Sequence, residues 1–400
     1  MKLARFDADS CCFPKPRVSV LPTRPELQFS GRCLVGVGKR GVASQYRHFA
    51  RGRYALGEAY RLAGVSREGA LLAPAYHCVT MLDPALALGA AVQLYPLHAD
   101  LSPDLDKLDR LLAASGKTVN ALLATHFFGF TQDFSSLKHW CEAHRIVLIE
   151  DCSHVLFTEH FHSTGAGLYG RFVTASPYKF FACPDGGLLY SPGIPLPDSV
   201  ITKSPGLIPE LRGIKRTLEK FRSAGSMVKD IAKIDLQLEA LDPCPVPVPN
   251  EQITAYTQPS SLYTAADSKT TALRSSRFIV RHSSIEANIR ARQNNYRRWL
   301  KAIEMLPNCH ALFSDLPESC TPYMFPLHID HPASHFYLLK HLGVPIWRWD
   351  EMAVSDCQVA QDYRMHLLHL PCHQSLSTEQ IDWMIAAFEK TMHRAAQGVL

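Results

Sequence analysis

The sequence predicts an α/β protein, with a large domain built around a mostly parallel sheet between helices and a smaller α/β domain towards the C-terminus. Between about residues 55 and 190, short apolar runs alternate with helical segments. This pattern is typical of parallel strands that are covered by helices on both faces. After a Pro-rich stretch at 243–259, amphipathic helical and apolar segments resume from about residue 275. These two observations predict the fold class.

The periodicity of apolar residues places each element in turn. Runs of four or five apolar residues predict strands at 70–73, 91–95, 121–125, 146–149, 172–175 and 187–190. Helical spacing predicts helices at 54–63, 81–88, 105–114 and 134–144. Beyond them we expect a solvated helix at 207–225, one long amphipathic helix at 275–306, and the elements of a small domain at 322–329, 335–342 and 380–392.

The same pattern divides the chain into four parts. They are an N-terminal arm with the start of the large domain at 1–50, the large domain at 51–205, a variable helical and Pro-rich excursion at 206–270, and the small domain at 271–400. Strands of such a sheet end at a common edge, and functional residues gather there. We therefore look for site residues directly after the predicted strands.

Composition excludes several classes of protein. Of the 400 residues, 46% are hydrophobic and 20% are charged, which is an ordinary globular balance. The net charge of +5 is too small and too scattered to indicate a nucleic-acid partner. No apolar run reaches the roughly 18 residues of a membrane span, and the charged N-terminus is unlike a signal peptide, so we expect a cytoplasmic protein. The 19 His and 12 Cys residues lack metal-ligand spacing, and no metal site is expected.

The sharpest local feature is the segment ASPYKFFACPDGGLLY at 175–190. Lys179 follows a predicted strand. The hydroxyls of Thr174 and Ser176 stand before it, and the two glycines at 186–187 stand after it. A lysine becomes a nucleophile when it is desolvated or held as a Schiff base. Hydroxyls can bind phosphate oxygens, and glycines let the backbone approach a flat ring. A surface lysine before a Gly-Gly hairpin is the alternative.

Asp151 stands at a strand end in the segment IVLIEDCSH, upstream of Lys179. A carboxylate at a buried strand end is costly without a cationic partner. The protonated ring nitrogen of pyridoxal 5'-phosphate (PLP) is one such partner, and an acid there strengthens the ring as an electron sink. Alone, Asp151 is explained equally well as a cap on the next helix. An Asp and a Lys in this order, each after a strand, favour the cofactor.

At these positions the sequence resembles the DegT/StrS-type family of sugar aminotransferases, within the fold-type I PLP enzymes. The family's Glu-Asp run with a His three residues after the Asp is similar to 150–154, and its lysine with a following acid-Gly-Gly is similar to Lys179 and 185–187. Its His-x-x-Gly element matches 126–129, and 52–56, 74–78 and 370–377 match more loosely. The resemblance covers about residues 52–390 and implies a seven-stranded, mostly parallel sheet.

The resemblance implies a role for each matching residue. Lys179 would form the internal aldimine with PLP and then move protons. Asp151 would pair with the ring nitrogen, and His154 would contact the phenolic oxygen. Backbone N–H groups where a helix begins would hold the phosphate. The residues expected at that helix start are Gly52, Arg53 and Tyr54; the other cofactor-binding candidates are Tyr76, His77, His126, Thr174 at the usual phosphate-binding position, and Ser176 near it.

Departures from the family pattern leave alternatives open. Arg53 stands where the family has a hydroxyl, and it either binds the phosphate or points to solvent. Cys78 stands where an aromatic side chain often covers the cofactor ring, so Tyr76 or His77 would stack there instead. His126 is explained equally well by hydrogen bonds to nearby backbone.

The resemblance implies a PLP-dependent aminotransferase that moves an amino group from an amino acid, glutamate or glutamine, to a keto group of a sugar nucleotide or related metabolite. It also implies a homodimer with shared active sites, in which Arg281 or Arg292 could reach the cofactor phosphate of the other subunit. Arg348 stands between two tryptophans and is a candidate for binding the donor's carboxylate, with structural cation–π packing as the alternative. The excursion, in particular 260–268, could cover the site.

Three other functions compete with transamination. A dehydratase-like enzyme would keep the cofactor and eliminate from a sugar, although the family's dehydratase branch lacks the lysine. A catalytically silent relative would act as an interaction protein, which the unusual Arg53 turn favours. A cysteine desulfurase needs an exposed, activated thiol, and only Cys357 or Cys320 is placed for that.

Overall fold

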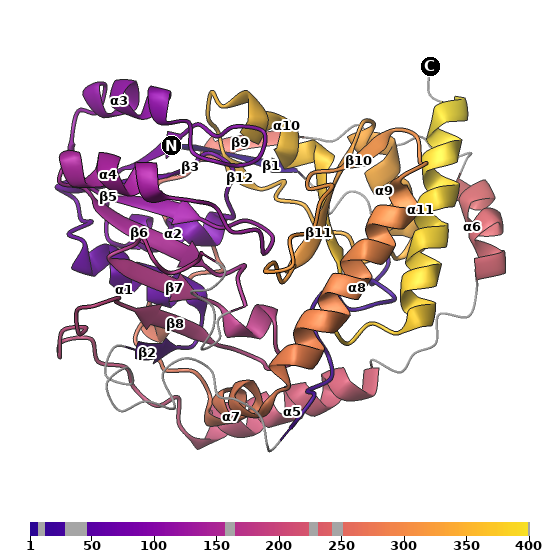
Figure 1. Ribbon diagram of the computed structural model, residues 1–400, viewed down its shortest axis with the longest axis horizontal. Helices are drawn as coiled ribbons and strands as arrows, with labels where there is room; N and C mark the ends of the chain where they lie inside the picture. Colours follow the sequence, from indigo (N-terminus) through magenta and orange to yellow (C-terminus); the bar gives the residue numbers. More distant parts are fainter. Residues whose placement is uncertain (7–12, 29–45, 157–164, 224–230, 242–250, 399–400) are drawn as a thin grey trace.

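The computed structural model describes residues 1–6, 13–28, 46–156, 165–223, 231–241 and 251–398, with the side chains of the last four of these left out. The ribbon in Figure 1 shows a large domain, drawn in indigo to magenta, beside a smaller domain drawn in orange and yellow. The HFH segment at 160–162, the densest group of histidines in the sequence, lies outside the described residues. Among the described helices none is long and apolar enough to cross a membrane.

The large domain contains a seven-stranded sheet in the order β2-β8-β7-β6-β5-β3-β4. Its strands are β2 (Tyr46–Phe49), β3 (Gly69–Pro74), β4 (Val92–Tyr95), β5 (Thr118–Thr125), β6 (Val147–Cys152), β7 (Phe172–Ala175) and β8 (Gly187–Tyr190). Only β8 runs antiparallel to its neighbours. The predicted mostly parallel seven-stranded sheet is confirmed. The sequence analysis missed β2, because this edge strand is only half buried and carries two polar side chains.

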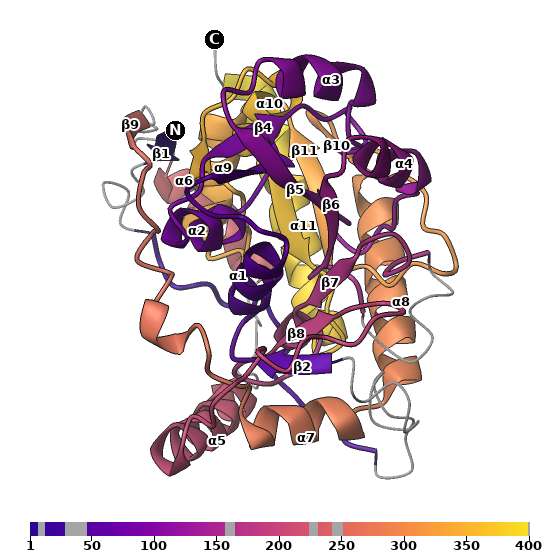
Figure 2. The same cartoon turned by 90° about the vertical axis from the view of Figure 1, so that its left-hand side faces the viewer.

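Helices cover both faces of this sheet, as the alternation of apolar segments predicts. Figure 2 shows α1 (Gly52–Leu62) and α2 (Val79–Ala87) on one side of the strands and α4 (Ser135–Ala143) on the other; α3 (Leu105–Ala113) packs on the same face as α4. Neighbouring residues of one strand point to opposite faces. On β5, accordingly, Leu122 belongs to the core under α3 and α4, and Leu123 to the core under α1 and α2.

The small domain is built on a three-stranded antiparallel sheet in the order β10-β11-β13. Its elements are α8 (Ile285–Ile303), β10 (Cys309–Ala311), β11 (Met324–Ile329), α9 (Pro332–Leu342), α10 (Gln358–His366), β13 (Leu367–Pro371) and α11 (Thr378–Gly398). Trp299, Phe325 and Trp383 are among the fully buried side chains of its core.

The single long helix predicted at 275–306 is wrong in one respect. The chain forms two helices there, α7 (Arg274–His282) and α8. The Oγ of Ser283 donates to the carbonyl oxygen of Ile279 at 2.7 Å, and Ser284 has extended backbone and accepts from the N–H of Ala287 at 3.4 Å. Serines at this place therefore end one helix and cap the next, which apolar periodicity alone does not reveal.

A third sheet joins segments that are distant in the sequence. Strand β1 (Lys2–Phe6) pairs with β9 (Glu251–Ala255) and with β12 (Met352–Ala353), both antiparallel. Strand β9 lies inside the stretch that the sequence analysis describes as a Pro-rich excursion. The excursion also contains α5 (Leu207–Ser223), α6 (Ile234–Leu241) and the short helical turns η5 (Ile231–Lys233) and η6 (Ala265–Asp267).

Candidate active site

A cavity of about 200 Å³ lies where the carboxyl ends of β5, β6 and β7 meet the small domain. The sheet supplies Thr125, Asp151 and Ser176, the start of α1 supplies residues 51–53, and the small domain supplies Tyr323, Trp349 and His369. Parallel strands bring their carboxyl ends to one edge of the sheet. The fold thus brings Lys179, Asp151 and His154 together, as the sequence predicts.

Lys179 lies in the short helical turn η4 (Pro177–Lys179) that follows β7. Its N–H donates to the carbonyl oxygen of Ser176 at 3.0 Å, so the turn is closed directly after the strand. Its Nζ lies 5.4 Å from the centre of the Tyr323 ring. The ammonium group is therefore held at an aromatic wall that the small domain contributes.

The carboxylate of Asp151 is buried at the carboxyl end of β6. It accepts hydrogen bonds from the N–H of Ser153 at 2.9 Å and from the Oγ1 of Thr174 at 3.2 Å. Among the described residues no cationic side chain pairs with it, and the nearby Oγ1 of Thr125 is buried without a partner. Burying an ionised carboxylate without a cation is costly, so this edge of the cavity fits a cationic ring nitrogen.

Two serine hydroxyls lie at the start of α1. The Oγ of Ser176 donates to the Oγ of Ser153 at 3.0 Å, and a Cβ added to Gly52 would lie 2.0 Å from the Oγ of Ser176. Any residue larger than glycine would therefore fill the space between the helix start and the hydroxyls. The first N–H groups of a helix have no partner within it and attract anions. Hydroxyls and N–H groups together form a cradle for a phosphate.

The structure separates the two hydroxyls that flank Lys179 in the sequence. Ser176 lies at the start of α1, whereas the hydroxyl of Thr174 is used by Asp151. The geometry therefore favours Ser176 over Thr174 for the phosphate. The two glycines after Lys179 also have a different task from the predicted one. A Cβ on Gly187 would lie 2.3 Å from the carbonyl oxygen of Arg51, and the N–H of Gly186 donates to the carbonyl oxygen of Ala50 at 2.9 Å. They pack against the turn before α1, not against a ring.

The arginines at this turn are both engaged with protein groups. The guanidinium of Arg53 donates to the backbone carbonyl oxygen of Leu262, and that of Arg51 lies 4.9 Å from the centre of the Tyr178 ring. Arg53 thus contacts the excursion instead of pointing freely to solvent. The N–H of Tyr54 donates to the carbonyl oxygen of Arg51 at 3.1 Å, which closes the first turn of α1.

Two buried histidines flank the cavity. The Nδ1 of His154 accepts from the N–H of Phe128 at 3.2 Å, so its Nε2 carries the proton. Its ring stacks on Tyr323 at 4.5 Å. Burial, together with the charges of Lys179 and His369, lowers the pKa of His154 well below its ordinary value. Burial, followed by the charge of Lys179, lowers the pKa of His369 to about 3. Both rings are therefore neutral near pH 7.

Neither Tyr76 nor His77 lines the cavity, so the expectation that one of them stacks on a cofactor ring is wrong. Both side chains are fully buried behind it. The hydroxyl of Tyr76 lies 2.8 Å from the Nε2 of His369, and His77 bonds to the carbonyl oxygens of Pro74 and Ala75 and to the N–H of Ala353. Residues that directly follow a buried strand pack between the domains here. The aromatic cavity wall comes instead from Tyr323 and Trp349.

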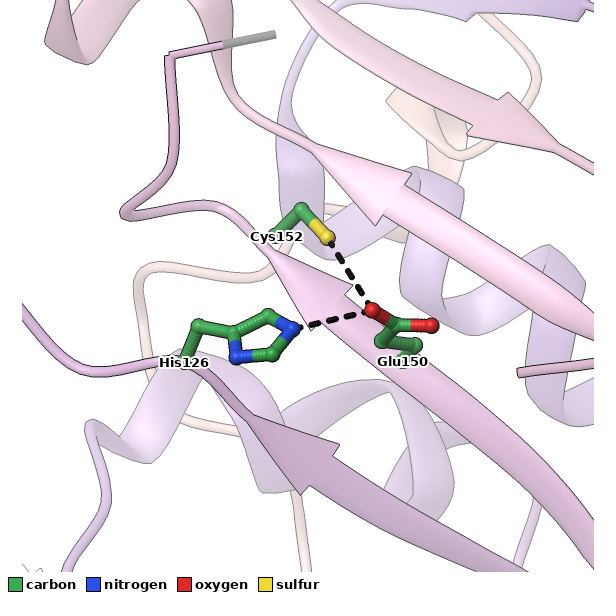
Figure 3. A group of neighbouring side chains, drawn as sticks. All are labelled: His126, Glu150 and Cys152. Atoms are coloured by element: carbon green, nitrogen blue, oxygen red, sulfur yellow. Dashed lines mark hydrogen bonds and ion pairs between the residues drawn. The ribbon is translucent and has the colours of Figure 1, made fainter. Parts of the chain in front are cut away.

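His126 contacts Glu150, which points to the other face of β6 from Asp151. Figure 3 shows His126 with Glu150 and Cys152. Its Nε2 lies 2.9 Å from the Oε1 of Glu150, and its Nδ1 accepts from the N–H of Gln132 at 3.0 Å. It does not line the cavity, because successive residues of β6 point to opposite faces. The alternative explanation, a histidine bonded to its surroundings, describes it better than contact with the cofactor.

Glu150, His126 and Cys152 have the composition of a metal site but are already satisfied. Glu150 accepts from His126 and from the backbone N–H groups of Gly167, Tyr169 and Gly170. Burial alone would raise the pKa of Glu150, but these hydrogen bonds and the charge of His126 hold it below its ordinary value. The hydrogen bonds of Glu150 anchor residues 167–170 to β6.

Arg348 does not reach the cavity, although Trp347 and Trp349 on either side of it do. Its buried guanidinium lies 3.7 Å from the centre of the Phe336 ring and 4.8 Å from that of Phe6. The donor-binding expectation for Arg348 is therefore wrong, and the cation–π alternative describes it.

Both candidate thiols for a desulfurase, Cys357 and Cys320, are buried, and burial raises the pKa of Cys320 far above its ordinary value. An exposed, activated thiol is absent at both positions.

The segment that carries this site is similar to a known family. A family model described as the DegT/DnrJ/EryC1/StrS aminotransferase family matches residues 48–196, the segment that carries both Asp151 and Lys179. The chain is also similar to the L-glutamine:2-deoxy-scyllo-inosose aminotransferase of Streptomyces kanamyceticus, with 26% identity over 250 residues. That match covers 58% of this chain and 53% of the relative, so the chain spans about half the length of this curated protein.

Solved structures of other proteins share the fold over most of this chain. The aminotransferase TlmJ from Streptoalloteichus hindustanus superposes with a TM-score of 0.59 at 15% identity, over 94% of this chain and 100% of that one. NtdA from Bacillus subtilis, solved with the bound cofactor PMP, superposes with a TM-score of 0.58 at 14% identity, over 87% of this chain and 73% of that one. The fold-type I architecture is confirmed.

The DegT-family motifs predicted only the residues that the large domain contributes to the cavity. The sequence analysis missed Tyr323, Trp349 and His369, which come from the small domain and lie outside the matched segment. His369 follows a run of apolar residues in β13, but nothing in its local sequence distinguishes it from the other histidines.

Proposed function

We propose that this protein is a PLP-dependent aminotransferase, which moves an amino group from glutamate or glutamine to a keto group of a sugar nucleotide or related metabolite. One observation carries the proposal. Among the described residues, no cationic side chain pairs with the buried carboxylate of Asp151, which lies in the same cavity as Lys179, and a phosphate cradle lies at the start of α1 in that cavity.

The cavity residues fit PLP part by part. The Asp151 carboxylate would hold the protonated ring nitrogen, which is a strong, charge-assisted hydrogen bond. The hydroxyls of Ser176 and Ser153 and the N–H groups at the start of α1 would hold the phosphate. Lys179 would bind the aldehyde carbon through its Nζ. The Nε2–H of His154 would donate to the phenolic oxygen. Bound PLP supplies an electron sink for carbanion chemistry.

The chemistry of the chain itself is proton movement in a dry site. The Nζ of Lys179 would take a proton from the α-carbon of the amino donor and return one to the carbon on the other side of the donor nitrogen, which is general acid–base catalysis by a positioned amine. The aromatic walls of Tyr323 and Trp349 exclude water and so strengthen the charge interactions of Asp151. His154, which is neutral, can donate without adding a second positive charge beside Lys179.

The choice of substrates rests on similarity. The relative from Streptomyces kanamyceticus is named for glutamine and for a cyclic ketone, which supports glutamine as the donor and a polyhydroxylated ketone as the acceptor. We further propose a homodimer with shared active sites, in which the exposed Arg281 is the candidate for contact with the other subunit. The described cysteines are all free, which supports a reducing, cytoplasmic location.

The test is the visible absorption of purified protein after addition of PLP, followed by glutamine and, separately, glutamate. We expect a band of protein-bound cofactor in the parent protein and in the control Lys301→Ala, whose lysine is exposed on α8. Lys179→Ala should abolish the band. In the parent protein and in Lys301→Ala, addition of either amino acid should convert the band to that of the aminated cofactor.

Each other result contradicts a defined part of the proposal. If the parent protein shows no band, the proposal that it binds PLP is overturned, and a catalytically silent relative is favoured. A band that survives Lys179→Ala would overturn the role of this lysine. A band that responds to neither glutamine nor glutamate would overturn the proposed donor and leave the cofactor.

A further inference from the structure

A second group of chemically active side chains lies on the small domain, apart from the cavity. His328 comes from β11, and Asp362 and His366 come from one face of α10, one helical turn apart. One nitrogen or oxygen atom of each of these three residues lies within 4.8 Å of the others. The Nε2 of His328 lies 2.9 Å from the Oδ2 of Asp362, and the Nε2 of His366 lies 3.9 Å from its Oδ1.

His366 is oriented as a metal ligand would be. Its Nδ1 lies 2.7 Å from the carbonyl oxygen of Ile329, and a carbonyl can only accept, so Nδ1 carries the proton. The lone pair of the ring is then on Nε2, which faces Asp362. A hydrogen bond from the second ring nitrogen to a backbone carbonyl is the usual outer support of a histidine that binds a metal.

His328 has a buried ring nitrogen that no hydrogen bond explains. Its Nδ1 has no hydrogen-bond partner in the part of the chain that the structure describes, and it lies 3.8 Å from the Oδ1 of Asp330. If Nε2 bound a metal, the proton would sit on Nδ1, and Asp330 would be the carboxylate that accepts it.

The site is open enough for an ion to enter. The side chains of His328, His366 and Asp362 are 13%, 27% and 45% exposed. The rings of His310 and His366 stack on His328 at 4.6 and 5.1 Å, so the ring of His328 is fixed from two sides. Two imidazoles and one carboxylate are the ligands of many zinc sites that keep a water in the fourth position.

We propose that His328, Asp362 and His366 bind one divalent transition-metal ion of the Zn²⁺ type, with Asp330 as the outer partner of His328. The ion would link β11 to the end of α10, directly before β13, the strand that carries His369 to the cavity wall. It would thereby fix the edge of the small domain from which the cavity is completed. The proposal does not depend on the proposed function, because none of these residues lines the cavity.

The experiment is a calorimetric titration of zinc chloride into the full chain after treatment with EDTA and dialysis, without added PLP. We expect one Zn²⁺ per chain at this site, and a weaker affinity in both His366→Gln and Asp362→Asn. Replacing an outer partner of a ligand costs about 10- to 100-fold in metal affinity. Asp330→Asn should fall in that range, and each ligand variant should lose at least as much.

The control is His139→Gln, which removes an exposed histidine of α4 and should leave the titration unchanged. Thermal unfolding in EDTA shows whether each variant folds. If one of the two ligand variants does not fold, the zinc affinity of the other one tests the proposal. The proposal is overturned if the parent protein does not bind Zn²⁺, or if the folded ligand variants bind it as tightly as His139→Gln does. Unchanged affinity in Asp330→Asn would overturn the outer role of that carboxylate.

Discussion

Arg292 donates a hydrogen bond from its Nη2 to the backbone carbonyl oxygen of Lys179 at 3.2 Å. The arginine lies on α8 and is fully buried. Its Nη1 donates to the carbonyl oxygens of Pro322 and Tyr323, and its guanidinium lies 4.6 Å from the centre of the Phe180 ring. The sequence analysis suggested that Arg292 could reach the cofactor phosphate of another subunit. The structure contradicts this, because the guanidinium is buried and bonded within its own chain. It joins the turn that contains Lys179 to the segment that carries Tyr323.

We expect Arg292→Met to reduce kcat by about 100-fold, because a shift of roughly 1 Å at the reacting group costs that much. The free energy of unfolding should also fall, since each buried carbonyl left without a donor costs about 1–3 kcal/mol. Steady-state kinetics and urea unfolding measure the two effects. Arg297→Met, an exposed change on the same helix, should alter neither. A kcat that falls no further than that of Arg297→Met would contradict the positioning role.

Gly52→Ala should weaken PLP binding by at least about tenfold, because the added Cβ would lie 2.0 Å from the Oγ of Ser176, inside the phosphate cradle. Fluorescence titration with PLP measures the change in Kd. Gly57→Ala on the same helix is the matched control, since its Cβ would meet the side chains of Pro84 at 3.2 Å and Tyr263 at 3.9 Å, and neither belongs to the cradle. Equal affinities in the two variants would show that the phosphate binds elsewhere.

The buried histidines predict how stability depends on pH. His369 has a pKa of about 3 in the folded chain, against about 6.5 when unfolded. Between these values the unfolded chain binds a proton that the folded chain does not, so the free energy of unfolding falls as pH falls. The slope is about 1.4 kcal/mol per pH unit for one such group.

The measurement is urea unfolding of the parent protein and His369→Gln at pH 7.5 and pH 5. The glutamine can still accept from the hydroxyl of Tyr76, and the loss of stability between the two pH values should shrink by roughly 1–2 kcal/mol. His139→Gln, an exposed change, should keep the parent's loss. An identical loss in His369→Gln would mean that this histidine is not held neutral.

The fold and the sheet side of the site could be predicted because their signals are local. Asp151 and Lys179 each follow a short apolar strand, and in a parallel sheet that position alone brings them to one edge. Tyr76 and His77 also follow a strand, yet they face the small domain instead of the cavity. The direction of a side chain after a strand end depends on the turn that follows, which periodicity does not determine.

The small-domain side could not be predicted, because it depends on how two domains pack. Tyr323 and His369 lie far from Lys179 in the sequence and carry no motif that points to it. Arg292 appears in an ordinary arginine-rich helix, and only the structure shows that it is the buried one. His328, Asp362 and His366 meet through the pairing of β11 with β13 and the position of α10, so a search for ligand spacing along the chain passes over them.

Segment 260–268 of the excursion should govern access of the amino donor to the cavity. Asp83 is the residue that holds this segment in place. The buried carboxylate of Asp83 accepts from the N–H and the Oγ of Ser260, both at 2.7 Å, and from the hydroxyl of Tyr256 at 2.8 Å. Leu262, two residues on, lines the cavity. Asp83→Asn keeps the shape of the side chain but weakens acceptance from these donors, since hydrogen bonds to an ionised group are about twice as strong.

We therefore expect Asp83→Asn, and more strongly deletion of 260–268, to raise the KM for the amino donor several-fold while the absorption of bound cofactor persists. Steady-state kinetics and the visible spectrum separate the two effects. Glu58→Gln, on the neighbouring helix α1 and paired with Arg61 at the surface, is the control and should change neither. Loss of the cofactor band on deletion would show that the segment is part of the fold and not a cover for the site. An unchanged KM in both variants would show that the donor enters by another route.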